Sequence, residues 1–188
     1  DVAYAAGHLD LTIEMLERLY ADSLRSGDRL TAGTAAARVA MSLLFDTALL
    51  APVRGWVRRA ERLLEGYDDT PAHAWLAVAR NYERLLSGDF PEARRWAQRA
   101  IEVGAKHDPA AAALGRIAEA RSLILEGEVE QGLALLDEAA VATVSGELDS
   151  FLTGVVYCEL VCGMQGVRQY HLAEEWAQGM GRWRHGRT

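Results

Sequence analysis

The segment Gly88-Asp89-Phe90-Pro91-Glu92-Ala93-Arg94-Arg95-Trp96 is repeated along this chain. It returns as Gly127-Glu128-Val129-Glu130-Gln131-Gly132-Leu133-Ala134-Leu135 and more faintly as Gln169-Tyr170-His171-Leu172-Ala173-Glu174-Glu175-Trp176. Two earlier copies are Val53-Arg54-Gly55-Trp56-Val57-Arg58-Arg59-Ala60 and Gly7-His8-Leu9-Asp10-Leu11-Thr12-Ile13-Glu14-Met15. Copies spaced by about forty residues are typical of stacked helical repeats, which form an extended surface.

The composition agrees with this interpretation. The chain is rich in Ala, Leu, Glu and Arg, has 4 prolines among 188 residues and lacks strand-like runs of β-branched residues, so helices are favoured. We predict an all-α fold, a right-handed α-solenoid of about five antiparallel helix pairs with a period near 40 residues. The prediction is one repeat domain over 1–188, with approximate units 1–30, 31–69, 70–107, 108–148 and 149–188. Because the chain starts at Asp1 without a methionine, we expect it to be part of a larger protein.

Each unit is predicted to contain an upstream helix, a turn and a downstream helix. Thr70-Pro71 and Asp108-Pro109 place a capping side chain before a proline, which favours a helix start. Pro52 is predicted to lie in the turn between two helices, and Gly88 and Gly127 to end the helices before them. The predicted helices are 1–6 (the end of a helix that Gly7 stops), 9–24, 34–47, 53–64, 70–87, one after Gly88, 108–126, 129–142, 149–166 and 171–183.

The repeated positions predict a buried stripe on each downstream helix. Small residues are expected where paired helices cross, and two further sets follow three and seven positions later, as on a buried helix face. An aromatic box for a ligand is the alternative, but packing explains the spacing without one. The three sets are Ala93, Gly132 and Ala173; Trp56, Trp96, Leu135 and Trp176; and Ala60, Ala100, Ala139 and Met180.

Charge and cysteine content limit the class of protein. With 20 basic and 27 acidic side chains, the net charge of −7 opposes nonspecific binding to nucleic acid or to anionic membranes. No stretch approaches the roughly 20 apolar residues of a membrane span, and we expect a cytoplasmic protein. Cys158 and Cys162, the only cysteines, are predicted to be buried free thiols, since a zinc site needs further ligands nearby.

We predict no catalytic residue, no metal site and no cofactor. None of the five histidines has a partner at the spacing of a helical metal motif such as His-Glu-x-x-His. The glycine-rich stretches 163–166 and 179–181 lack the preceding strand and the following Lys-Ser/Thr of a phosphate loop. They are better explained as turns or helix ends.

A ligand groove, if present, is expected on the concave face, which upstream helices line in such arrays. Tyr82 and Arg121 occupy equivalent positions in successive repeats, so both are predicted to face one groove. Glu159 interrupts the apolar run 155–161, and its charge should meet either solvent or a cation. The alternative for each residue is a solvated helix face with ordinary salt bridges. The candidate binding residues are Arg80, Tyr82, Glu83, Glu119, Arg121 and Glu159.

At the repeated segments the chain resembles the tetratricopeptide family, whose downstream helix opens with Gly-Asp-Tyr-like residues followed by Ala. The period here is longer than that family's thirty-four residues. In this respect the chain is similar to the helical repeat region of large MalT-like bacterial transcriptional regulators of the LuxR family. The stretches 120–139, 145–158 and 173–183 resemble the repeats of actinobacterial LuxR regulators and of some multidomain nucleotide cyclases.

The resemblance implies a noncatalytic module that binds a protein partner or a small-molecule effector. It would couple this binding to a DNA-binding domain outside the chain, without itself contacting nucleic acid. One alternative is a regulatory repeat segment of a multidomain nucleotide cyclase, and another is a free-standing scaffold for protein interactions. Because solenoids usually close their ends with polar caps, and this chain starts and stops within the pattern, we also expect exposed apolar stripes and self-association.

Overall fold

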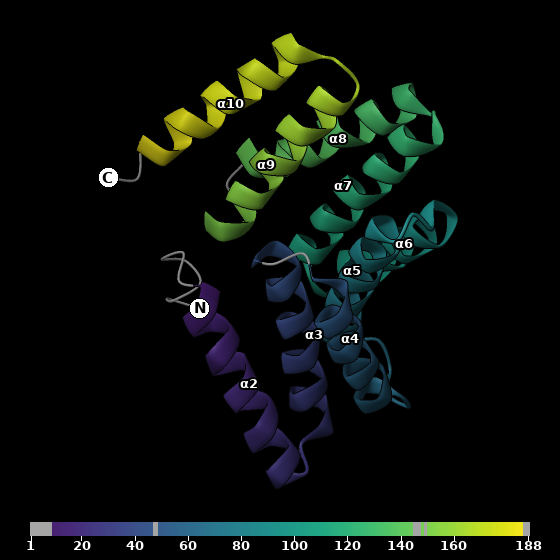
Figure 1. Cartoon of the computed structure of the whole chain (residues 1–188), viewed down its shortest axis with the longest axis vertical. Coiled ribbons are helices and arrows are strands. Elements are labelled where there is room, and N and C mark those ends of the chain that lie inside the picture. The colour runs from purple at the N-terminus through teal and green to yellow at the C-terminus, as the bar shows by residue number, and fades with distance from the viewer. Residues whose placement is uncertain (1–8, 47–48, 145–147, 149, 186–188) are drawn as a thin grey trace.

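The computed structural model describes residues 9–46, 49–144, 148 and 150–185, and within these residues all regular structure is helical. The predicted all-α class is therefore confirmed. Antiparallel neighbours follow one another along the chain (Figure 1). The helices are α2 (Leu9–Ser26), α3 (Arg29–Asp46), α4 (Leu50–Leu64), α5 (Pro71–Leu86), α6 (Phe90–His107), α7 (Pro109–Glu126), α8 (Val129–Val144), α9 (Ser150–Gly166) and α10 (Tyr170–His185).

The helices form two sets that differ in their neighbours. The first set consists of α3, α5, α7 and α9. In it α3 packs against α5, α5 against α7, and α7 against α9. In the second set, α4, α6, α8 and α10 each pack against the helix that precedes them in the chain. Figure 1 shows α2 and α10 at opposite ends of the array, with α5 and α7 in its middle. The members of the first set, called the inner helices below, thus bring residues from successive pairs side by side.

A recurring turn ends three helices of the array. Gly27, Gly88 and Gly127 have φ values of +78°, +78° and +94°, a left-handed conformation that glycine adopts without strain. After each glycine the next N–H donates back into the helix, as Glu128 does to the carbonyl of Leu123 at 2.8 Å. Such bonds satisfy carbonyl groups at the helix end. Gly88 and Gly127 therefore end their helices as predicted, and Gly27 makes the same turn after α2.

The turn between α9 and α10 repeats this geometry without a glycine. Arg168 has a φ of +61°, and the N–H of Gln169 donates to the carbonyl of Met164 at 2.9 Å. Gln169 opens the faintest copy of the repeated segment. The geometry of the turn is therefore retained here although its glycine is not. This left-handed conformation costs a residue other than glycine about 1–2 kcal/mol.

The predicted helix starts at Thr70-Pro71 and Asp108-Pro109 are confirmed. The carboxylate of Asp108 accepts hydrogen bonds from the N–H groups of Ala110 and Ala111 at 3.1 and 3.2 Å. At Thr70, the N–H donates to Nδ1 of His73 at 3.2 Å. Pro71 and Pro109 are the first residues of α5 and α7. Prolines fit there because the first N–H groups of a helix have no intrahelical acceptor.

Two predicted boundaries are wrong. The second upstream helix, expected from Thr34, begins at Arg29, directly after the Gly27 turn. The next helix begins at Leu50 rather than Val53, so Pro52 lies inside its first turn and not between helices. Its missing N–H is not required in the first turn, which is why proline does not break the helix here. The helix predicted over 1–6 lies outside the described residues.

Small residues sit where paired helices cross, as predicted. Ala93 is fully buried, and its carbonyl accepts a hydrogen bond from the Asn81 side chain of α5 at 2.7 Å. A Cβ on Gly132 would lie 2.6 Å from Cγ1 of Ile124 and 2.8 Å from the carbonyl oxygen of Ala120. These distances are too short for any side chain, so only glycine lets α8 approach α7 this closely.

The tryptophan stripe serves packing, which agrees with the interpretation preferred from the sequence. Trp56, Trp96, Leu135 and Trp176 are all partly buried against the core. The ring of Trp56 meets that of Tyr20 edge to face, with centroids 4.9 Å apart, an arrangement that aromatic quadrupoles favour. The guanidinium of Arg59 lies 4.5 Å from the Trp56 ring centroid. The Arg59 guanidinium also lies 5.8 Å from the Tyr20 ring centroid, so Tyr20 connects α2 with α4.

No helix within the described residues is both long enough and apolar enough to cross a membrane.

Candidate functional site

Three of the predicted site residues come together on the inner helices. A guanidinium nitrogen of Arg121 in α7 lies 2.6 Å from a carboxylate oxygen of Glu159 in α9, which joins two successive pairs. The carboxylate that was expected to meet solvent or a cation thus meets a cation. Burial lowers the pKa of the Arg121 guanidinium, but the charge of Glu159 outweighs this and leaves the pKa above its ordinary value.

Tyr82 of α5 belongs to the same cluster. Its side chain is only 6% exposed, and its hydroxyl has no hydrogen-bond partner. Burial raises the pKa of the phenol well above its ordinary value, and the charge of Glu159 raises it further while that of Arg121 opposes the shift. The Phe45 ring of α3 packs against the Tyr82 ring with centroids 6.2 Å apart. The hydroxyl is therefore a neutral buried donor within the field of the Arg121–Glu159 pair.

Two thiols lie beside this pair, contrary to the sequence prediction. Cys158 and Cys162 are free, but both are exposed and not buried. The prediction placed both cysteines on a buried face of this apolar run, whereas their side of α9 faces solvent. Partial burial raises the pKa of the Cys158 thiol, and the neighbouring Cys162 and Glu159 raise it further. We define the inner cluster as Tyr82, Arg121, Cys158, Glu159 and Cys162.

Arg80 and Glu83, also predicted as site residues, lie in a different cluster between α4 and α5. The Glu83 side chain is 3% exposed and accepts from Nε of Arg54 at 2.8 Å and from Arg80 at 3.2 Å. Arg80 in turn donates through Nε to Glu61 at 2.7 Å. This ion cluster binds α4 to α5. Burial raises the pKa of Glu83, but the arginines outweigh it and hold the pKa below its ordinary value.

Glu119, the sixth predicted residue, contacts α6. Its carboxylate accepts from the side-chain amide of Gln98 at 2.9 Å and lies 3.7 Å from the guanidinium of Arg94. Arg94 and Gln98 both belong to α6, so Glu119 joins α7 to a helix of the preceding pair and does not reach the inner cluster. The salt bridges of the alternative stated from the sequence are present at Arg80, Glu83 and Glu119, but Glu83 is buried and does not lie on a solvated helix face.

A pocket that sequence reasoning missed lies at the turn between α4 and α5. It has a volume of about 540 Å³ and is lined by Glu61, Arg62, Leu64, Glu65, Gly66, Tyr67, Asp69, His73, Leu76 and Arg99. The charged groups at its wall are partly paired, since Arg99 lies 2.6 Å from Asp69. A sequence signal for it is hard to find, because its wall combines three helices and a turn.

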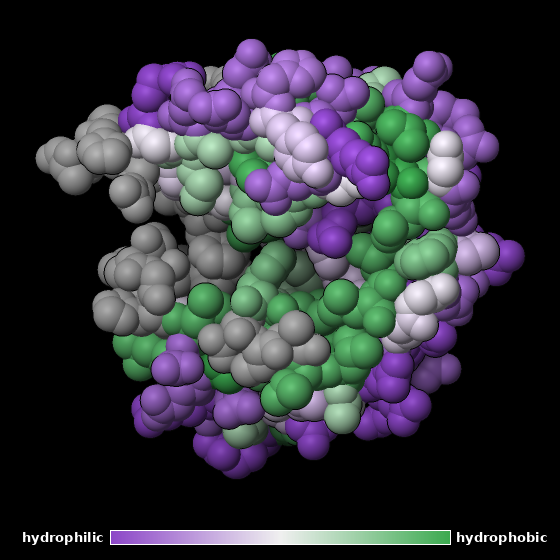
Figure 2. Space-filling view, turned by 45° about the horizontal axis from the view of Figure 1, so that its top comes forward, coloured by the Kyte–Doolittle hydropathy of each residue, from purple (hydrophilic) through white to green (hydrophobic). Residues whose placement is uncertain are grey.

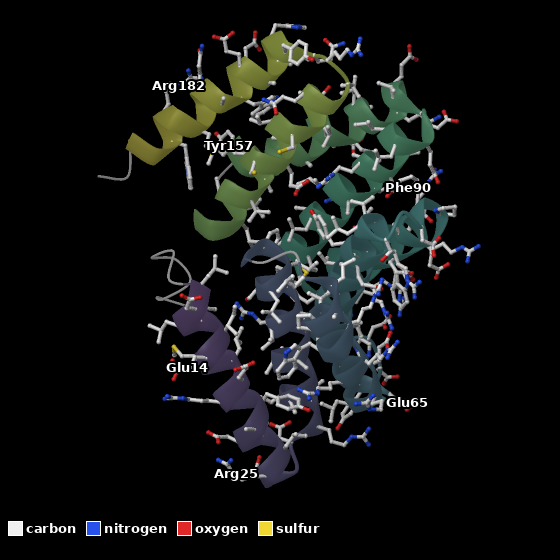
Figure 3. The ribbon with its side chains drawn as sticks, viewed as in Figure 1. Glu14, Arg25, Glu65, Phe90, Tyr157 and Arg182 are labelled. Atoms are coloured by element: carbon white, nitrogen blue, oxygen red, sulfur yellow. The ribbon has the colours of Figure 1, made fainter. Side chains whose placement is uncertain are left out.

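The surface of the array combines polar and apolar regions. In Figure 2 hydrophobic residues gather along a hollow in the face shown, with hydrophilic residues along both of its rims. At the last pair, Tyr157 of α9 packs against the rings of Trp176 and Trp183 of α10, with centroids 6.0 and 5.9 Å away. Figure 3 shows Tyr157 between the ribbons of these two helices, while Arg182 of α10 points outward.

Among the described residues, no three His, Cys, Asp or Glu side chains gather closely enough to hold a metal ion. The inner cluster offers instead a buried phenol, a partly exposed ion pair and two thiols, a set suited to binding. No protein-family model matches this chain, and no curated protein sequence matches it either.

Proposed function

We propose that this chain is a noncatalytic binding module, a right-handed α-solenoid of tetratricopeptide-like repeats. In this proposal the inner helices bind a protein partner or a small-molecule effector through the inner cluster. The observation that carries it is that Tyr82, Arg121 and Glu159 reach one place from α5, α7 and α9, with the Tyr82 hydroxyl left without a partner.

The unpartnered hydroxyl supports binding because a buried polar group without a hydrogen bond costs about 1–3 kcal/mol. Arg121 and Glu159 are within reach of a ligand, since their side chains are 31% and 13% exposed. A bound acceptor would satisfy the hydroxyl and recover that free energy. Binding would also alter the link between α7 and α9, and so the relation between successive helix pairs.

The proposed context is a cytoplasmic LuxR-type transcriptional regulator of bacteria, and it rests on the resemblance of the repeated segments. The recurrence of one turn at Gly88, Gly127 and Arg168 supports repeats with a period near that of such regulators. In this context the module senses a partner or effector and transmits the change to a DNA-binding domain elsewhere in the protein. The net charge of −7 supports a role that does not include contact with DNA.

The complete reading frame is the first test of this context. A helix-turn-helix domain in the same protein is the expected result. A nucleotide cyclase domain in its place would contradict the regulator and favour regulation of nucleotide synthesis, and the absence of any effector domain would favour a scaffold.

The second test measures transcription from a promoter controlled by the full-length protein. Arg121→Met and Glu159→Gln are expected to change the output, because they remove the inner ion pair. Arg95→Met is the control, since Arg95 pairs with Glu92 on the exposed side of α6. Unchanged output from both inner variants, at equal protein abundance and thermal stability, would contradict the proposed site.

A further inference from the structure

The exposed thiols of α9 form a pair at helical spacing. Cys158 and Cys162 are four residues apart in α9, and both are exposed. Side chains at this spacing are neighbours on a helix surface. They are also the only two cysteines of the chain, so any thiol chemistry of this protein belongs to this pair.

The helix geometry opposes a direct bond between the two sulfur atoms. Cβ atoms four residues apart on a helix are separated by roughly 5–6 Å, whereas a disulfide requires roughly 3.5–4.5 Å. A disulfide would therefore need α9 to unwind between Tyr157 and Val161. An ion placed between the sulfur atoms needs no such change, because it lengthens the bridge.

The choice of ion follows from ligand type and number. Thiolates are soft ligands that select Cu(I), zinc or iron–sulfur clusters. Structural zinc sites use four ligands, and no third metal-binding side chain joins the thiols among the described residues. Cu(I) accepts two thiolates as a complete coordination sphere, so the pair suffices for it.

The charge around the pair suits the complex that would form. Two thiolates and one Cu(I) ion carry a net charge of −1, and the reaction releases the two thiol protons without any oxidation or reduction. Arg121 is close enough to act electrostatically on both Cys158 and Cys162. Its partner Glu159 offsets part of this charge, but Arg121 remains 31% exposed.

We propose that Cys158 and Cys162 bind one Cu(I) ion as a two-coordinate dithiolate site on the exposed side of α9, with Arg121 compensating its charge. The Cu(I) site uses Cys158, Cys162 and Arg121 of the inner cluster, but the inference does not rest on the proposed function. Loading of the site would place a negative charge beside the Arg121–Glu159 pair and so alter the binding surface.

The test is an anaerobic competition in which the 188-residue chain withdraws Cu(I) from its coloured complex with bicinchoninate. We expect the chain to remove one equivalent and to stay monomeric or retain its metal-free oligomeric state. Cys158→Ser/Cys162→Ser, which has no thiol, should remove none, and each single variant should lose most of the affinity. Both residues are exposed, so circular dichroism should show intact helices in these variants.

Arg121→Met is expected to weaken Cu(I) binding roughly tenfold, because it removes the neighbouring positive charge. Arg116→Met, on the same helix, is the matched control and should bind Cu(I) as the unaltered chain does. The proposal is wrong if the chain removes no Cu(I), if the thiol-free variant removes as much, if a single thiol suffices, or if two chains share one ion. Equal weakening by Arg116→Met would refute the role of Arg121 alone.

Discussion

At the level of single residues, Arg168 stands where two other pairs of the array have a glycine. Its φ of +61° is unfavourable for an arginine by about 1–2 kcal/mol, because the Cβ crowds the following carbonyl. We predict that Arg168→Gly increases the free energy of unfolding by about 1 kcal/mol. Urea denaturation followed by circular dichroism measures this. Arg182→Gly, in the exposed part of α10, is the control and should destabilise, since glycine weakens a helix interior.

Tyr82 is a residue at which stability and function are expected to oppose each other. Its hydroxyl is buried without a partner, so Tyr82→Phe should increase the free energy of unfolding by about 1 kcal/mol. The same variant should reduce the response of the full-length protein in the promoter assay, because the donor that a ligand would satisfy is gone. A variant that is more stable and fully responsive would show that the hydroxyl takes no part in binding.

At the level of helices, two glycines predict opposite effects of the same substitution. Gly132 lies at the crossing of α7 and α8, where an added Cβ meets atoms 2.6 and 2.8 Å away, and overpacking of this kind costs about 1–3 kcal/mol. Gly55 in α4 has nothing within 4 Å of an added Cβ. We therefore expect Gly132→Ala to destabilise the protein and Gly55→Ala to stabilise it by about 0.5–1 kcal/mol, both measured as urea midpoints. Equal effects would refute the close crossing.

The ion cluster between α4 and α5 predicts that the stability of the protein depends on pH in the acid range. The pKa of Glu83 is lower in the folded protein than its ordinary value of 4.5. Its contribution to stability is therefore fully present above about pH 4.5 and is lost as the pH falls through the lowered pKa. We predict that Glu83→Gln is less stable than the unaltered chain at pH 7 but loses less stability on acidification. The control is Glu92→Gln, which removes the surface pair of Glu92 with Arg95. It should leave the free energy of unfolding nearly unchanged.

For the whole molecule, the exposed apolar stripe of α2 bears on self-association. Leu11, Met15 and Leu19 follow one another at helical spacing and are 46%, 52% and 45% exposed. In Figure 3 Glu14 and Arg25 of this helix point away from the rest of the array. The exposed stripe confirms the expectation of an apolar end, and self-association through it stays a prediction. Multi-angle light scattering should show a mass that rises with concentration, and Met15→Glu should abolish the rise. A monomer at every concentration would contradict the prediction.

The sequence by itself determined the helices and most of their ends. Caps such as Asp108 and turn residues such as Gly127 act on backbone groups within a few positions of themselves, so their effect is readable from the local pattern. The repeat spacing also located the small crossing residues Ala93 and Gly132. It overlooked Gly104, where a Cβ would lie 2.6 Å from the backbone nitrogen of Ala112, because this glycine belongs to no repeated position.

Only the tertiary structure decided which candidate residues share a site. Tyr82, Arg121 and Glu159 meet because α5, α7 and α9 pack in succession, whereas Arg80 and Glu83 turn toward α4 and Glu119 toward α6. Residues a few positions apart on one helix thus point to different neighbours. That choice, like the exposure of Cys158, depends on how each helix is rotated about its own axis against its partners. Packing of the whole array sets this rotation, and no local pattern of residues encodes it.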